Sequence, residues 1–82
     1  MHELGILNHV VKTVNRIAEE NRIEKIDHIT LEVGEASGCV PAFLEKLFPI
    51  AIEKQPKMQD AELRIVMAEG KEMSIKDIGY KK

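Results

Sequence analysis

The first three residues, Met1-His2-Glu3, place an amine, a backbone amide and an imidazole next to one another. The Met1 amine, the deprotonated His2 amide nitrogen and the nearer imidazole nitrogen of His2 can close two chelate rings around one ion. Three nitrogens in a plane leave a fourth position open, and square-planar nitrogen coordination is typical of Ni(II) or Cu(II). The candidate metal site is therefore Met1, His2 and Glu3, and the alternative is that His2 is only the second residue of a solvated terminus. Glu3, a second copy of the chain or a partner would fill the fourth position, or the isolated domain would hold the ion more weakly.

This site leads directly into an amphipathic helix, predicted from about Glu3 to Asn21. Apolar residues recur there at helical spacing: Leu4, Leu7, Val11, Val14 and Ile17. Glu3 lies in the first turn, where a negative side chain suits the positive end of the helix dipole. The first N–H groups of a helix have no partner within it, so an amide there can lose its proton to a metal without breaking a helical hydrogen bond.

The rest of the chain predicts a strand, a second helix and two more strands. The expected ranges are Ile26–Gly34, Pro41 to about Gln55, Leu63–Met67 and Met73–Ile78. Glu69-Gly70 fits a hairpin turn that would make the last two strands antiparallel neighbours, and residues 80–82 are expected to fray. A strand, helix and strand imply a right-handed parallel pair. The fold class is therefore α/β (α+β): one small domain, order α-β-α-β-β, with two helices packed on a mixed three-stranded sheet.

The composition excludes several classes of function. Twelve basic against 14 acidic residues give a net charge of −2, without the basic surface of a nucleic-acid-binding protein. One cysteine permits neither an internal disulfide nor a four-thiolate zinc site. No stretch approaches the roughly 20 apolar residues that span a bilayer, and no leader pattern precedes the helix. We therefore expect a cytoplasmic protein that binds neither nucleic acid nor membrane.

Three other residues could do chemistry but are better explained as structural. His9 lies about 10 Å along the helix from His2, too far to share its ion within one chain. His28 alternates with the apolar residues of its strand, which predicts an exposed position on the sheet face or edge. Cys39 precedes the second helix, where a dipole could activate a thiol, but no second cysteine accompanies it. An enzymatic function is therefore not predicted.

Four segments, in order along the chain, carry a family resemblance. MHELGI, LEVGEASGCVP, DAELRI and MSIKDI resemble the HypA/HybF family of hydrogenase-maturation nickel metallochaperones. The resemblance implies that His2 is the essential nickel ligand and that Met1 and the adjoining backbone of His2 and Glu3 complete part of the site. It also implies delivery of Ni(II) to the large subunit of [NiFe]-hydrogenase, or sometimes to urease, with a maturation GTPase as partner.

The chain departs from that family between its last two strands. Family members carry a zinc module with two CxxC pairs there, whereas this chain has only Ala68-Glu69-Gly70-Lys71-Glu72. Strands joined by a hairpin are already neighbours, so a short turn could reconnect them. We therefore expect a nickel-binding domain over residues 1–82, without structural zinc, with the insertion point near 68–72, as a monomer or weak homodimer. The alternative is a metal-independent interaction module for the maturation GTPase.

Overall fold

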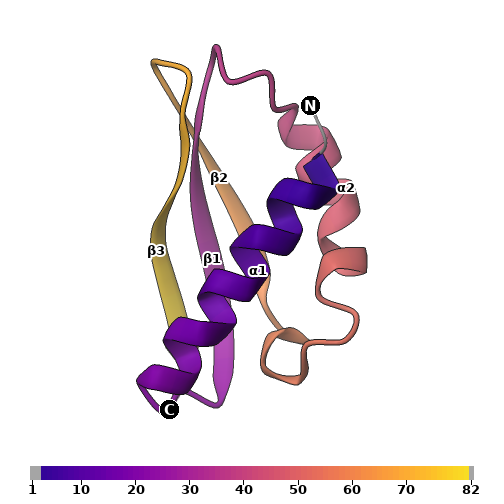
Figure 1. Cartoon of the computed structure of the whole chain (residues 1–82), viewed down its shortest axis with the longest axis vertical. Coiled ribbons are helices and arrows are strands. Elements are labelled where there is room, and N and C mark those ends of the chain that lie inside the picture. The colour runs from indigo at the N-terminus through magenta and orange to yellow at the C-terminus, as the bar shows by residue number, and fades with distance from the viewer. Residues whose placement is uncertain (1–2, 82) are drawn as a thin grey trace.

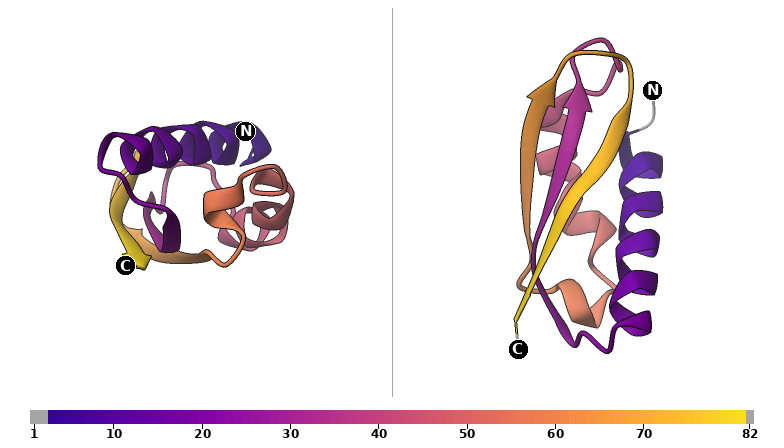
Figure 2. Two further views of the ribbon diagram at one scale, coloured as in Figure 1. Left: turned by 90° about the horizontal axis from the view of Figure 1, so that it is seen from below. Right: turned by 90° about the vertical axis from the view of Figure 1, so that its left-hand side faces the viewer.

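The structure, a computed structural model, describes residues 3–81 of the chain. Its elements are α1 (Glu3–Glu20), β1 (Lys25–Gly34), α2 (Pro41–Ala51), the 3-10 turn η1 (Pro56–Met58), β2 (Glu62–Ala68) and β3 (Met73–Lys81). Both helices lie on one side of a three-stranded sheet (Figures 1 and 2). The predicted order of elements, the mixed sheet and the single small domain are confirmed. Within residues 3–81, no helix is long and apolar enough to cross a membrane.

α1 is held in place by its apolar side. Five of its residues are buried in the core: Leu7, Val10, Val11, Val14 and Ala18. Burial of a side chain the size of Leu or Val contributes about 1.5–3 kcal/mol, so packing on the sheet stabilises this helix more than local propensity does. The helix ends where Arg22 adopts a φ of 57° and the N–H of Ile23 donates to the carbonyl of Ala18 over 2.8 Å.

β1 is the central strand of the sheet. It pairs in parallel with β2, from His28 opposite Glu62 to Gly34 opposite Ala68, and antiparallel with β3, from Lys25 opposite Lys81 to Val33 opposite Met73. β2 and β3 therefore lie on opposite sides of β1, and the predicted hairpin between them is wrong. β1 is the most deeply buried of the three strands. The central position in the sheet removes the most apolar surface of such a strand from contact with water.

Residues 68–72, which we call the arch, cross the end of β1 instead of turning back beside β2 (Figure 2). Three backbone N–H groups donate to the arch: Gly34 to Glu72 at 2.8 Å, Glu35 to Ala68 at 2.8 Å and Ala36 to Gly70 at 2.9 Å. A Cβ atom at Gly34 would lie 2.5 Å from the carbonyl oxygen of Gly70. Gly34 is thus the residue that lets the arch pass this close to β1.

Two predicted boundaries are also wrong. α2 ends at Ala51 and not near Gln55, because Pro49 cannot donate a helical hydrogen bond and the helix stops soon after it. β3 extends through Lys81, so Tyr80 and Lys81 belong to the sheet and are not frayed. Lys82 lies outside the described residues.

Candidate metal-binding site

Two residues of the predicted metal site, Met1 and His2, lie outside the described residues. The third, Glu3, begins α1 and is half-buried. The start of α1 lies beside the start of α2 at one end of the molecule (Figure 1). We call the residues Glu3, Leu4, Val40 and Phe43 at these two starts the helix-start region. Its first residue, Glu3, directly follows Met1 and His2 in the sequence.

Glu3 joins the two helix starts. Its Oε2 atom accepts a hydrogen bond from the backbone N–H of Val40 at 3.3 Å, across 37 positions of sequence. Val40 is the N-cap residue of α2 but has no side chain that can cap it, and Pro41 follows. One carboxylate thus lies at the positive ends of two helices, where both dipoles favour a negative charge. The second oxygen of the same carboxylate is chemically able to approach a cation.

Apolar side chains are exposed in the same region. Leu4 is 37% exposed, Val40 42% and Phe43 53%. Leu4 follows Glu3 directly, and the N–H of Phe43 donates to the carbonyl of Val40 at 3.0 Å, so all three adjoin the Glu3 contact. Exposed apolar groups gathered in one region are typical of a surface that meets another protein.

Cys39 also lies next to the helix-start region, directly before Val40. It is half-buried, packs against the core, and its backbone N–H donates to Ser37 Oγ at 3.2 Å. His9 is exposed on α1. Among the residues from Glu3 to Lys81, no group of three or more His, Cys, Asp or Glu side chains is arranged to hold a metal ion.

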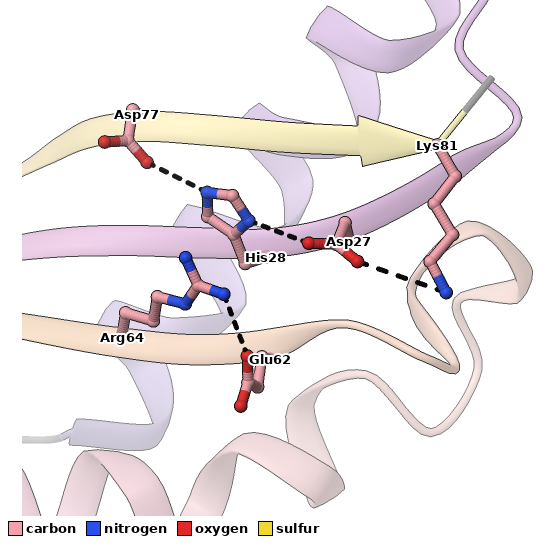
Figure 3. Close-up of polar contacts among 6 residues, drawn as sticks. All are labelled: Asp27, His28, Glu62, Arg64, Asp77 and Lys81. Carbon is pink, nitrogen blue, oxygen red and sulfur yellow. Dashed lines mark hydrogen bonds and ion pairs between the residues drawn. The ribbon is translucent and has the colours of Figure 1, made fainter.

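His28 lies on the face of the sheet away from the helices, within a set of charged residues (Figure 3). Its Nδ1 atom is 3.0 Å from Asp27 Oδ2, and its Nε2 atom is 3.4 Å from Asp77 Oδ1. The hydrogen bond with His28 lowers the pKa of Asp27 below the ordinary 3.8, and the charge of Lys81 acts in the same direction. Both ring nitrogens therefore face carboxylates of the same chain, and we call these three residues the His28 cluster.

The His28 cluster connects β1 to β3, and sequence reasoning missed it. The sheet-face position of His28 is as predicted, but its side chain is only 21% exposed. Gly79 of β3 lies against the imidazole, and a Cβ atom at that position would overlap the ring. The signal was the glycine opposite His28, which becomes visible only when the pairing of β1 with β3 is known.

Comparison with known proteins identifies the family to which the chain belongs. Residues 1–76 match the family described as "Hydrogenase/urease nickel incorporation, metallochaperone, hypA". The hydrogenase maturation factor HypA of Shewanella sp. (strain MR-7) is 33% identical over 67 residues, which cover 82% of this chain and 56% of that protein. HypA of Crocosphaera subtropica is 32% identical over 71 residues, which cover 87% of this chain and 59% of that protein. The chain thus spans little more than half the length of these curated relatives.

A solved structure shares the fold. The solution structure of the Ni metallochaperone HypA from Helicobacter pylori matches with a TM-score of 0.87, over 98% of this chain and 97% of that chain. The identity is 17%, so this likeness concerns the arrangement of helices and strands.

Proposed function

This chain belongs to the HypA family, and from that premise we propose that it binds Ni(II) through Met1, His2 and Glu3 and delivers it for maturation of [NiFe]-hydrogenase or urease. The observation that carries the proposal is that the family match begins at residue 1, so the Met1-His2-Glu3 motif lies within it. Metallochaperones carry ions and do not convert substrates. The family therefore agrees with the prediction that the chain is not an enzyme.

In the proposed site, Ni(II) is cargo held by three nitrogens of the first two residues. The Met1 amine and the His2 imidazole must both be deprotonated to bind, and their ordinary pKa values are about 7.7–8.0 and 6.5. A cation at the positive end of a helix dipole is disfavoured by roughly 0.3–1 kcal/mol. Two negative charges offset this cost: the one left on the His2 amide nitrogen by deprotonation and the one on the Glu3 carboxylate. The bond from Val40 to Glu3 supports the proposal because it fixes the first turn of α1 to α2.

The proposed partners are the large subunit of the hydrogenase and a maturation GTPase, in the cytoplasm. We expect no structural zinc, because the arch stands where the family carries its zinc module. β2 and β3 are not neighbours in the sheet, so a hairpin turn between them does not replace the module. What joins them is an arch bonded to Gly34, Glu35 and Ala36, and these bonds give the domain a closed end without the module.

Calorimetric titration with Ni(II) tests the proposal on three proteins: the native chain with a free Met1, His2→Ala, and a chain with one residue added before Met1. We expect one ion per chain for the first and no measurable binding for the other two. His9→Ala, an exposed histidine on the same helix, is the matched control and should bind like the native chain. Affinity should fall steeply on mild acidification. Equal nickel affinity in all of these proteins would refute the proposed site.

The second candidate, a metal-independent module for the maturation GTPase, is favoured by the exposed apolar side chains of the helix-start region. Its test is binding of the purified GTPase to the native chain, to His2→Ala and to Phe43→Ser, with and without Ni(II). Binding that is weakened by Phe43→Ser but indifferent to nickel and to His2→Ala would favour this candidate. Binding that needs both the ion and His2 would exclude it.

A further inference from the structure

The two edges of the sheet are built differently. Along β3 the pairing register shifts twice, between Ile26 and His28 and between Thr30 and Leu31 of β1, and the strand carries Lys76, Asp77 and Lys81. Register shifts and charged side chains are features that prevent an edge strand from pairing with another chain. β2 has an unbroken register with β1 over its whole length, from Glu62 to Ala68.

β2 carries no net charge and exposes two apolar side chains. Val66 is 38% exposed and Met67 46%. The two charged residues of the strand pair with each other, with Arg64 Nη2 at 3.2 Å from Glu62 Oε2 (Figure 3). Within residues 3–81 no strand lies beyond β2, so alternate backbone N–H and C=O groups point outward from the sheet. This edge therefore lacks the protection that β3 has.

We propose that β2 pairs antiparallel with β2 of a second copy of the chain, so that two sheets become one continuous sheet. A two-fold axis perpendicular to the sheet brings identical strands together in antiparallel orientation and keeps each side chain on its own face. The axis must then pass midway between the two copies of one residue of β2, and that residue names the axis below. The proposal does not depend on nickel binding.

The charges on β2 select the position of the axis. An axis at Ile65 places every residue of β2 opposite a residue of the partner strand: Glu62 with Ala68, Leu63 with Met67, Arg64 with Val66, and Ile65 with itself. An axis at Arg64 would set two guanidinium groups directly opposite each other, which is destabilising. Axes at Leu63 or Val66 leave residues of β2 unpaired. The geometry therefore favours Ile65.

The same register explains why a second copy fits this edge. Arg64 would lie opposite Val66 of the other copy, so that its aliphatic stem covers the exposed valine while its guanidinium stays paired with Glu62. Leu63 would lie opposite Met67 and cover that side chain in the same way. No like charges stand directly opposite each other. Val66 and Met67, the two exposed apolar residues of β2, would thus be covered by Arg64 and Leu63 of the second copy.

Sedimentation equilibrium over a range of concentrations tests the pairing, with circular dichroism to verify the fold of each variant. The native chain should form a reversible dimer. Val66→Lys should raise the dissociation constant about tenfold or more, because a lysine on an edge strand opposes pairing. Tyr80→Lys, at a residue of β3 that is 52% exposed, is the matched control and should dimerise like the native chain. A chain that stays monomeric, or a dimer weakened only by Tyr80→Lys, would overturn the proposal.

Disulfide formation between two variants tests the register. Arg64→Cys and Val66→Cys, both in a Cys39→Ala background, are oxidised separately and as an equal mixture. Directly opposite Cβ atoms lie about 4.5–5.5 Å apart and diagonal ones about 7–8 Å, so only the former approach disulfide distance. We expect the mixed disulfide to form faster than either symmetric one. Symmetric disulfides in excess of the mixed one would overturn pairing around Ile65.

Discussion

The helix-start region and the His28 cluster are two of the regions in which side chains connect distant parts of the sequence, and they differ in how many polar atoms they engage. A single hydrogen bond of 3.3 Å joins Val40 to Glu3 at the helix starts. On the sheet, His28 contacts Asp27 at 3.0 Å and Asp77 at 3.4 Å, and Lys81 lies 4.0 Å from Asp27. A histidine whose two nitrogens face carboxylates of its own chain serves the fold. By residue type alone, His28 would have been as good a candidate metal ligand as His2.

The largest effect should come from closing the space beside His28. Gly79→Ala places a Cβ atom where the imidazole lies, and overpacking of this kind costs about 1–3 kcal/mol. Urea unfolding followed by circular dichroism measures the loss. Nickel affinity should stay unchanged, because the helix-start region is not affected.

The control for this prediction is the same glycine substitution in a His28→Ala background. Without the ring the added methyl group has room, so Gly79→Ala should cost much less there than in the native chain. An equal loss of unfolding free energy in both backgrounds would contradict the role assigned to Gly79. The sheet around His28 would then not be more sensitive to substitution, in unfolding free energy, than the helix starts.

A smaller effect is expected at the helix starts. Glu3→Ala removes the carboxylate from the positive ends of α1 and α2 and should cost about 0.5–1 kcal/mol of unfolding free energy at low ionic strength. Glu3→Gln should lose less, since its amide oxygen can still accept from the N–H of Val40. Added salt should reduce the difference in unfolding free energy between the native chain and Glu3→Gln, because salt screens the interaction of the carboxylate with the helix dipoles. Unfolding curves that coincide for all three proteins would show that the Val40 contact adds no stability.

The smallest effect is the pH dependence of the His28 cluster. The pKa of Asp27 is lower in the folded chain than its ordinary 3.8, so the unfolded chain binds more protons as the pH falls. The stability contributed by Asp27 is therefore complete well above pH 3.8 and is lost as the pH falls through the folded-state pKa. Asp27→Asn should show a shallower decline of unfolding free energy on acidification.

His28→Ala provides the comparison for Asp27, because it removes the hydrogen bond that is the main cause of the lowered pKa. It should flatten the acid decline nearly as much as Asp27→Asn does. A decline that persists unchanged in His28→Ala would assign the lowered pKa of Asp27 to the charge of Lys81 and not to His28.

The sequence was sufficient for those features that are encoded locally. The spacing of Leu7, Val11 and Val14 predicts α1, and the alternation of Ile29, Leu31 and Val33 predicts β1. Strand order was not available in this way. The short connection 68–72 suggested a hairpin between β2 and β3. The length of a connection does not tell which strand a neighbour will pair with, and both β2 and β3 pair with the more deeply buried β1.

The contacts of Glu3 and of the His28 cluster could not be predicted either, because they too depend on tertiary packing. Glu3 and Val40 are 37 positions apart, and neither residue type announces the bond, because the donor is a backbone N–H. The His28 cluster depends on the shifted register between β1 and β3, which places Gly79 opposite His28. Such partners follow from tertiary packing and not from local pattern. Gly34 was a local sign of the arch, as a glycine at the last position of β1.

The central position of β1 also governs the order in which the chain can fold during its synthesis. Val33 pairs with Met73 and Lys25 with Lys81, so one side of β1 stays open until the last strand has left the ribosome. Contacts over such separations close late and slowly. Until then α1 and β2 have only part of a sheet to rest on, and the nascent chain shows apolar surface that invites aggregation or chaperone binding. The assembly of the domain is therefore completed only after translation of its final strand.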